Sequence, residues 1–379
     1  MSNSYMTSTT EPLLALLQRF AQLELSTTDV LELNELLVGV DNWQTFLAQA
    51  ELYAIANFVL RHAEKHDLAI PKATLLGLKA LSMRHRAAAD ARYQLLQELL
   101  VAFEQKQIPI IGLKGVALAA MIYPSEELRP MRDIDLLVAK HQTAAAGEVL
   151  RDLGFDLPTQ QPSKYMRASH QLPNATKQVN GFTVSVEIHH DALASDVRDH
   201  LFFEQAQADL QRVNWRDVCF NTLAHETMLH QVSRHLEGLH PGAVLKLINV
   251  MDVVLYSEQF ISEIDWGLMK LRYPHVLNTL KCLSYISPLS DELRSIVGGA
   301  SNTELVGVGE IMLPLSHVFN GQRSLREQWN LLFCPSDWWL HLYYNVDPAS
   351  SLIAVKLFKH PLTIAGWILK RLYSRVRGG

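Results

Sequence analysis

The chain has 379 residues, a net charge of −5, and 48% hydrophobic against 19% charged residues. This length allows two or three domains with ample cores, and the composition is typical of a globular protein rather than a disordered one. The mildly acidic balance gives no overall nucleic-acid footprint. The three cysteines, Cys219, Cys282 and Cys334, are far apart. They indicate neither a disulfide framework nor a paired-cysteine metal site, so we expect a reducing, cytoplasmic environment.

Residues 1–105 are predicted to form a helical N-terminal region. The first residues are polar and show no signal-peptide pattern, and no run of 18 apolar residues predicts a membrane span. Apolar residues recur at three- and four-residue spacing over 13–25, 43–66 and 91–106, which is typical of amphipathic helices. Pro71 suits the first turn of a further helix.

Residues 106–195 are predicted to form a small α/β core. The expected order is a strand over 108–113, a helix over 115–122, a loop over 124–130 and a strand over 134–138. A helix over 142–153 follows and is closed by Gly154, a typical C-terminal glycine. A polar loop over 158–181 could cover a site, and the alternating, β-rich FTVSVEIH of 182–189 predicts a third strand.

Residues 196–379 are predicted to form a helical C-terminal region, because helical apolar spacing returns after the third strand. The last segment, LFKHPLTIAGWILKRLYSRVRGG, is basic and amphipathic. Such a helix can lie on a membrane surface, or it can dock on its own domain with its charges solvated. The whole pattern predicts an α+β protein: a small mixed sheet between two helical regions.

Two carboxylates stand two residues apart at the start of the apolar run Asp133-Ile134-Asp135-Leu136-Leu137-Val138. Side chains alternate along a strand, so Asp133 and Asp135 share one face. Two like charges side by side repel, and the arrangement makes sense mainly if a cation holds them. This pair is therefore the first candidate for a metal site.

Two further features point to a phosphate-handling enzyme. Ile110-Ile111-Gly112-Leu113-Lys114-Gly115 reads as a strand ending in a glycine turn that opens a helix, and a helix N-terminus is a natural seat for phosphate. Glu187 interrupts an apolar alternation, where a buried charge is costly unless it is paired or liganded. It is the candidate third carboxylate, and His189 on the same face could be a base or a supporting partner.

These residues resemble the DNA polymerase β-type nucleotidyltransferase superfamily. The resemblance rests on LKG before a helix, an arginine-bearing loop, the strand DIDLLV and a later strand carboxylate. The nearest resemblance is to the bacterial group of uncharacterised nucleotidyltransferase family proteins, in which Lys-Gly replaces the usual Gly-Ser and helical regions flank the core. It implies a nucleotidyltransferase fold for residues 106–195.

The resemblance implies metal-dependent transfer of a nucleoside monophosphate from an NTP, with ATP the expected donor, to an acceptor hydroxyl, with release of pyrophosphate. Mg²⁺ or Mn²⁺ would be held by Asp133, Asp135 and Glu187, which are also the implied catalytic residues. Nucleotide binding would involve Lys114 and Gly115, and also Arg129 and Arg132. The Lys114 ammonium would replace the missing serine hydroxyl as a point charge.

The sequence leaves several alternatives open. The acceptor could be a small molecule, a protein side chain or a tRNA end. A non-catalytic nucleotide-binding or interaction module with the same fold is the rival function. His225 and His230 lie five residues apart, on different helix faces, which argues against a zincin site. His230 with Arg234, and Lys246 with Asp252, could face the cleft or serve packing and ion pairing, and Tyr123 and Tyr165 could stack on a base or anchor the core.

Overall fold

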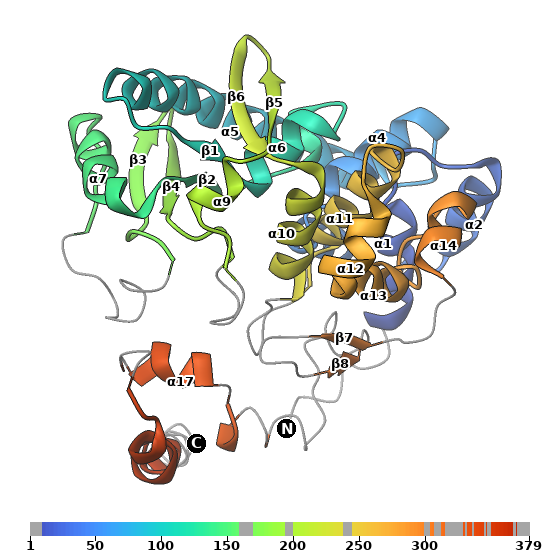
Figure 1. The fold of residues 1–379 in the computed structure, drawn as a ribbon. Helices are drawn as coiled ribbons and strands as arrows, with labels where there is room; N and C mark the ends of the chain where they lie inside the picture. Colours follow the sequence, from blue (N-terminus) through green and yellow to red (C-terminus); the bar gives the residue numbers. More distant parts are fainter. Residues whose placement is uncertain are drawn as a thin grey trace.

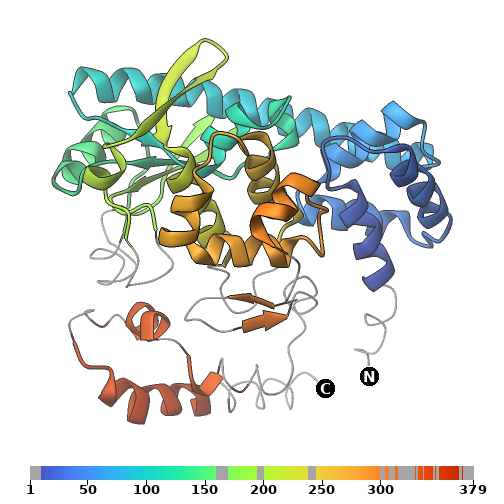
Figure 2. The same ribbon diagram turned by 45° about the vertical axis from the view of Figure 1, so that its right-hand side comes forward.

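A computed structural model describes residues 10–158, 170–193, 200–237, 245–298, 304–306 and 312–314, together with parts of the segment 329–369. The N-terminal helices are α1 (Thr10–Phe20), α2 (Thr27–Val38), α3 (Trp43–Leu52), α4 (Ala56–His66) and α5 (Lys72–Gln105). The two helices predicted around Pro71 and over 91–106 are one continuous helix of 34 residues. This helix, α5, runs along the top of the molecule (Figure 2).

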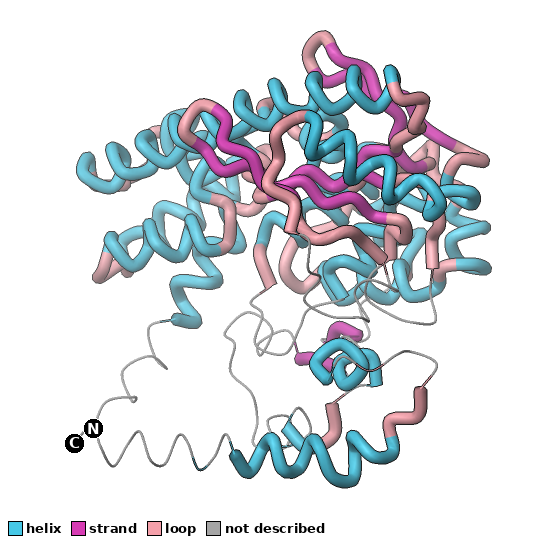
Figure 3. The backbone as a smooth tube through the Cα atoms, turned by 90° about the vertical axis from the view of Figure 1, so that its left-hand side faces the viewer, coloured by secondary structure: helices cyan, strands magenta, loops and turns pink. Residues whose placement is uncertain are grey.

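A six-stranded mixed sheet has the order β3-β4-β2-β1-β6-β5 and lies on the left in Figure 1. Its strands are β1 (Ile111–Gly112), β2 (Asp133–Leu137), β3 (Ala175–Val179), β4 (Phe182–His189), β5 (Leu210–Trp215) and β6 (Val218–Leu223). The central strands β2 and β4 are parallel, whereas β1 and β2 are antiparallel. The fold is α+β, with a mixed sheet and with helical regions before and after it in the chain, as predicted (Figure 3).

Short helices connect the strands and place the site. They are α6 (Lys114–Met121), η1 (Glu126–Leu128), η2 (Lys140–Gln142), α7 (Thr143–Asp152) and α9 (Phe203–Ala206). Helix α6 contacts β2, while α5 and α7 contact β4 and each other. Ile134, Leu136, Val186 and Ile188 are almost fully buried and form the apolar side of β2 and β4. The side chains between them therefore face the opposite side of the sheet.

Three strands lie where the sequence did not predict them. Strand β3 falls within the expected loop over 158–181, and the hairpin β5–β6 falls within residues expected to be helical. Both expectations were wrong for these residues. The hairpin completes the sheet because β6 pairs in parallel with β1. The predicted division at residues 105 and 195 stays a prediction, and the sheet itself continues past residue 195.

Helices also follow the sheet in the chain. They are α10 (His225–Glu237), α11 (Leu247–Gln259), α12 (Trp266–Arg272), α13 (Pro274–Leu283) and α14 (Asp291–Val297). These helices lie beside the N-terminal helices (Figures 1 and 2). The remaining described elements are β7 (Glu304–Val306), β8 (Met312–Pro314), α17 (Asp337–Tyr344) and the π-helical turn η3 (Val355–Lys359). Among the helices that the structure describes, none has the length and hydropathy to cross a bilayer.

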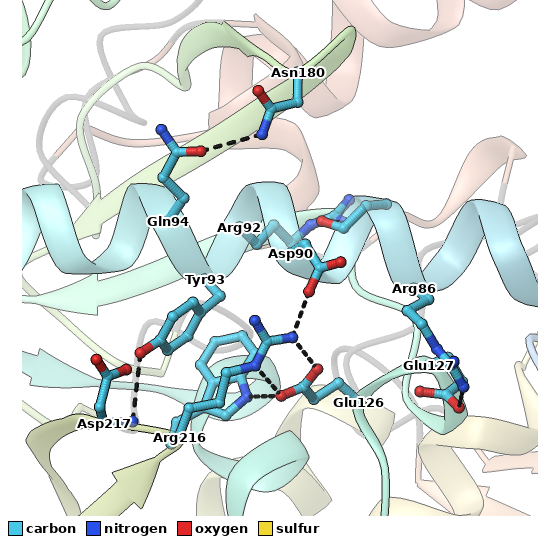
Figure 4. A network of polar contacts seen from close by, with 12 residues as sticks. Arg86, Asp90, Arg92, Tyr93, Gln94, Glu126, Glu127, Asn180, Arg216 and Asp217 are labelled. Carbon is cyan, nitrogen blue, oxygen red and sulfur yellow. Dashed lines mark hydrogen bonds and ion pairs between the residues drawn. The ribbon is translucent and has the colours of Figure 1, made fainter.

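A polar network fastens α5 to the sheet (Figure 4). Arg216, in the turn of the β5–β6 hairpin, donates from Nε to Glu126 Oε1 at 2.7 Å and also pairs with Asp90 of α5. Its guanidinium lies 4.5 Å from the centre of the Tyr93 ring. At the other end of the sheet, Asn180 donates to Gln94 at 3.1 Å. Helix α5 is thus held around residues 90–94 by two turns of the sheet.

Candidate active site on strands β2 and β4

The register of β2 and β4 places the predicted acidic residues side by side. Asp135 lies opposite Glu187, and Leu137 lies opposite His189. Asp133, two residues before Asp135, lies opposite Ser185 on the same face. Asp133 and Asp135 therefore share one face of β2, as predicted, and Glu187 of β4 lies on the same face of the sheet.

His189 lies between the two carboxylates. Its Nε2 atom is 2.9 Å from Asp135 Oδ1 and 3.4 Å from Glu187 Oε2. Ionised carboxylates only accept hydrogen bonds, so Nε2 carries the proton in this arrangement. Asn174 donates to the other oxygen of Glu187 at 2.7 Å, which orients that carboxylate.

Asp133, Asp135, Glu187 and His189 together are called the acidic cluster. Burial and neighbouring charges set the protonation of its members. Burial, together with the charges of Asp135 and Glu187, raises the pKa of Asp133 to about 6. Burial also acts to raise the pKa of Asp135, but Lys114 and His189 outweigh it, and this pKa lies below its ordinary value. Burial acts to lower the pKa of His189, yet its hydrogen bonds to Asp135 and Glu187 raise it overall. The cluster concentrates negative charge that a cation would relieve.

The geometry suits a divalent cation. Among the described residues, Asp135, Glu187 and His189 form a group whose ligand atoms all lie within 4.8 Å of one another. Carboxylate oxygens are the donors that Mg²⁺ prefers, whereas an imidazole nitrogen suits Mn²⁺ and other transition metals better. To ligate through Nε2, His189 would have to give up its proton. Asp133 stands outside this group, and its role as a ligand stays a prediction.

Lys114 and Gly115 begin helix α6 next to the acidic cluster. The Lys114 ammonium lies 3.5 Å from Asp135 Oδ1. Its φ of +40° is a left-handed conformation that L residues rarely adopt, and such strain is typical of functional positions. A Cβ atom on Gly115 would stand 2.9 Å from Met131 Sδ and 3.1 Å from Arg129 Nη1. The start of α6 therefore has room for glycine and little more, and phosphate contact by either residue stays a prediction.

The two predicted arginines lie in different surroundings. Arg129 is buried and donates to both oxygens of Asp252, from Nη2 at 2.7 Å and from Nε at 3.1 Å. Tyr123 donates to the same carboxylate at 2.7 Å. Arg132 is exposed. The structure thus gives Asp252 and Tyr123 a shared role in holding Arg129, while phosphate binding by either arginine stays a prediction.

The structure also brings two histidines to the site that the sequence did not single out. Burial and the charges of His189 and Lys114 lower the pKa of His170 to about 3, and its ring lies 6.3 Å from that of His189. His235 is an exposed residue, and the positive charge of Lys114 acts to lower its pKa. His235 lies on α10, which contacts α6 and β6, and the sequence pattern could not show which face of this helix meets them.

The other residues weighed in the sequence lie elsewhere. His225 lies 3.0 Å from the Tyr256 hydroxyl and 3.1 Å from Glu263, and His230 lies 3.0 Å from His275. These contacts join neighbouring helices and involve none of the acidic cluster. Tyr165 lies outside the described residues.

Comparison with known proteins adds a family. A family model described as "Uncharacterised nucleotidyltransferase" matches residues 40–286, a range that includes the acidic cluster. No curated protein matches the sequence. Two similar structures are a crystal structure of ANT(2")-Ia in complex with adenylyl-2"-tobramycin and a solution structure of the antibiotic-resistance factor ANT(2'')-Ia. Each is 12% identical with a TM-score of 0.33, over 45% of this chain and 91% and 85% of those chains, respectively.

Proposed function

The chain belongs to the family of uncharacterised nucleotidyltransferases and is a transferase. On that premise, we propose that it moves a nucleoside monophosphate from an NTP to an acceptor hydroxyl and releases pyrophosphate. The observation that carries this proposal is the convergence of Asp135, Glu187 and His189 beside the N-terminus of α6. It combines a cation site with a phosphate seat, which are the two requirements of this reaction.

The proposed residues have distinct roles. Asp133, Asp135 and Glu187 would hold Mg²⁺ or Mn²⁺, which when bound supplies positive charge against the phosphates. Lys114 now neutralises Asp135, and it would turn towards the triphosphate when that carboxylate is otherwise compensated. Gly115 and the first N–H groups of α6 would allow the phosphates to approach the backbone closely. Arg129 and Arg132 would add positive charge at the edge of the site.

The proposed reaction is an in-line displacement. The acceptor oxygen forms a bond to the α-phosphorus while the bond to the bridging oxygen breaks, and pyrophosphate leaves with the electron pair. The hydroxyl proton passes to a carboxylate, for which Glu187 is the candidate because Asn174 fixes its orientation. Positioning and charge would supply most of the rate enhancement. ATP is the proposed donor; a small molecule, a protein side chain and a tRNA end remain acceptor classes.

The direct test is transfer of label from each α-labelled NTP, with pyrophosphate release measured alongside, in Mg²⁺ or Mn²⁺. A cell extract supplies the acceptor. We expect Asp135→Asn and Glu187→Gln each to lower transfer about a hundredfold to a thousandfold. Asp135→Asn keeps an oxygen for Lys114 and His189, which both lie against Oδ1. Glu187→Gln keeps an acceptor for only one of its two donors, Asn174 and His189, so circular dichroism checks that each variant is folded. Glu148→Gln, at an exposed residue of α7, is the matched control.

The outcomes separate the proposal from its rival. Wild-type transfer that both site variants lose supports a nucleotidyltransferase, and the labelled species identifies the acceptor class. Tight NTP binding with no pyrophosphate release from any nucleotide would instead support a non-catalytic binding module. Equal transfer by Asp135→Asn and Glu148→Gln would refute the assignment of the site.

We also propose that the C-terminal helix contacts an anionic membrane surface at its periphery. Its described part, residues 353–366, exposes Leu357, Phe358 and Leu362 beside Lys356 and Lys359. Exposed apolar side chains interleaved with lysines are typical of helices that lie in the headgroup region. The basic residues that follow, from residue 370 onward, all lie outside the described residues.

A further inference from the structure

A cavity of about 570 Å³ lies between helices α3 and α5, the segment 129–132, the first residue of β4 and Lys246. Cavities that hold small-molecule ligands usually measure about 300–1000 Å³. Its charged lining is mainly basic and comprises Arg84, Arg92, Arg129, Arg132 and Lys246 against Glu51 and Glu126. We call it the basic pocket. None of Lys114, Gly115, Asp135 or Glu187 lines it. Arg129 and Arg132, which the proposed function places at the edge of the donor site, do line it, so the basic pocket adjoins that site.

Partners within the structure account for part of this charge only. Glu51 pairs with Arg84, and Asp252 holds Arg129. Glu126 accepts hydrogen bonds from Arg216 and from Trp215 at 2.7 and 2.8 Å, both outside the basic pocket (Figure 4). Within the described part of the chain, Arg92, Arg132 and Lys246 have no carboxylate partner. These three cations of the pocket therefore form no ion pair with a carboxylate among the described residues.

Arg92 and Lys246 carry specific signs of a missing anion. Arg92 donates from Nη1 to the Ala88 carbonyl of its own helix at 2.8 Å, but its buried Nε has no hydrogen-bond partner among the described residues. A buried donor without an acceptor is unfavourable, because it has given up its hydrogen bond to water. Burial lowers the pKa of Lys246, and the charges of Arg132 and Arg129 lower it further. An anion in the pocket would satisfy the donor and relieve this crowding of like charges.

The pocket adjoins the acidic cluster at one point. Arg132 lines it, and the next residue is Asp133 at the start of β2. The charge of Asp133 also acts on both Arg92 and Lys246, raising the pKa of each against the effect of burial. A molecule held by these cations would thus end beside the proposed site of transfer. The location suits the acceptor, since the donor phosphates are assigned to the start of α6.

We infer that the basic pocket binds the acceptor of the proposed reaction through a phosphate-type anionic group on a small molecule. The identification of the bound molecule as the acceptor rests on the proposed function, whereas the anion site itself rests on the pocket alone. Arg92 and Lys246 are its positioning residues, because they hold the anion without touching the reacting atoms. The volume favours a small molecule over a folded macromolecular surface.

The first experiment measures binding of inorganic pyrophosphate and of inorganic phosphate by calorimetry, in EDTA, so that no cation site contributes. Arg92→Gln and Lys246→Gln are compared with wild type. Lys79→Gln, at an exposed lysine of α5 paired with Glu64, is the matched control. We expect each pocket variant to bind about tenfold more weakly, the loss of one charge-assisted hydrogen bond. Circular dichroism checks that each variant is folded.

The second measurement uses a non-hydrolysable NTP analogue with Mg²⁺. Unchanged analogue affinity in Arg92→Gln and Lys246→Gln, together with weaker pyrophosphate binding, supports an acceptor subsite. A parallel loss of analogue affinity would assign the pocket to the donor and overturn the inference, as would tighter competition by single-stranded RNA than by small phosphates. Pyrophosphate affinities equal to that of Lys79→Gln would also overturn it. If the wild type shows no transfer but the pocket variants still bind pyrophosphate more weakly than the wild type does, the proposed function is refuted and the anion site is supported.

Discussion

At the scale of single residues, the buried group of Asp252, Arg129 and Tyr123 fixes the loop before β2. Burial and the Asp252 charge raise the pKa of Tyr123 well above its ordinary value, so its hydroxyl stays protonated and donates at physiological pH. Burial acts to lower the pKa of Arg129, but Asp252 raises it overall, and the guanidinium stays charged. Asp252 thus compensates a buried cation on a segment that also lines the basic pocket.

We expect substitutions of Asp252 and of its partner Tyr123 to lower the free energy of unfolding by unequal amounts. Asp252→Asn leaves the buried Arg129 charge uncompensated, and we expect it to lower the free energy of unfolding by about 3–5 kcal/mol. Tyr123→Phe removes one hydrogen bond to a carboxylate and should cost about 1–2 kcal/mol. Urea unfolding measures both, with Asp156→Asn at an exposed aspartate as control. Similar costs for Asp252→Asn and Tyr123→Phe would contradict the role given to Asp252.

At the scale of elements, the strength of the local signal decided what the sequence could predict. Strand β4 was predicted with its observed bounds, because FTVSVEIH alternates strongly. The hairpin β5–β6 was missed because its turn contains no glycine. Arg216 in that turn has a φ of +55°, a conformation that normally requires glycine or asparagine. Strand β3, with polar residues at its centre, gave an equally weak signal.

The features of the candidate site also divide into those that a local sequence pattern predicts and those that depend on long-range packing. Strand alternation is local, so the shared face of Asp133 and Asp135 could be predicted from their spacing. The pairing of Arg129 with Asp252 joins residues 123 positions apart, and no local pattern contains it. The approach of His235 to the cluster depends on how α10 packs, which is also a long-range property. The family resemblance seen in LKG and DIDLLV is confirmed by the family match.

Helix α4 carries a buried histidine that should make the N-terminal helices sensitive to acid. His62 is fully buried, and its Nε2 lies 2.8 Å from the Gln22 carbonyl. A carbonyl only accepts, so Nε2 holds the proton and the buried Nδ1, which has no partner among the described residues, is bare. Burial lowers the pKa of His62 below 6.5, so protonation would bury a charge.

The sign of the pH effect follows from linkage. Below about pH 6.5 the unfolded chain takes up a proton at residue 62 that the folded chain binds more weakly, so stability falls as pH falls. His62→Gln keeps a donor for Gln22 and removes the titration. Between pH 8 and 5.5 we expect the variant to lose about 1 kcal/mol less than wild type in urea unfolding. His141→Gln, at an exposed histidine, is the control, and an unchanged pH dependence in His62→Gln would refute the assignment.

At the scale of the whole molecule, the proposed site is assembled from regions distant in sequence. The acidic cluster comes from β2 and β4, the donor seat from the start of α6, and the basic pocket from α3 and α5 together with Lys246. Residue Ile248, at the start of α11, donates to the Tyr53 carbonyl after α3, which joins the helices before the sheet to those after it. Both helical regions therefore contribute residues to the basic pocket, which also includes Arg132 just before β2.

The proposed membrane contact of the C-terminal helix rests on its exposed apolar side chains. Leu357 is 64%, Phe358 66% and Leu362 73% exposed, while Leu352 and Val355 pack with Leu340 and Tyr344 in a small separate core. The helix thus buries one set of apolar side chains and leaves another in water. Insertion of the exposed set into an interface would remove their apolar surface from water, and the lysines would be attracted to anionic lipid.

We expect co-sedimentation of the full chain with vesicles that contain phosphatidylserine, little with pure phosphatidylcholine vesicles, and release at high salt because the attraction is screened. Replacing Leu357, Phe358 and Leu362 by serine should abolish binding. The matched control replaces three exposed apolar residues of α2 and α5 by serine, namely Leu31, Leu76 and Met83. It should bind the vesicles as the wild type does. Equal binding by both triple variants would place any membrane contact elsewhere, and absence of wild-type binding to either vesicle would favour a helix that keeps its charges solvated.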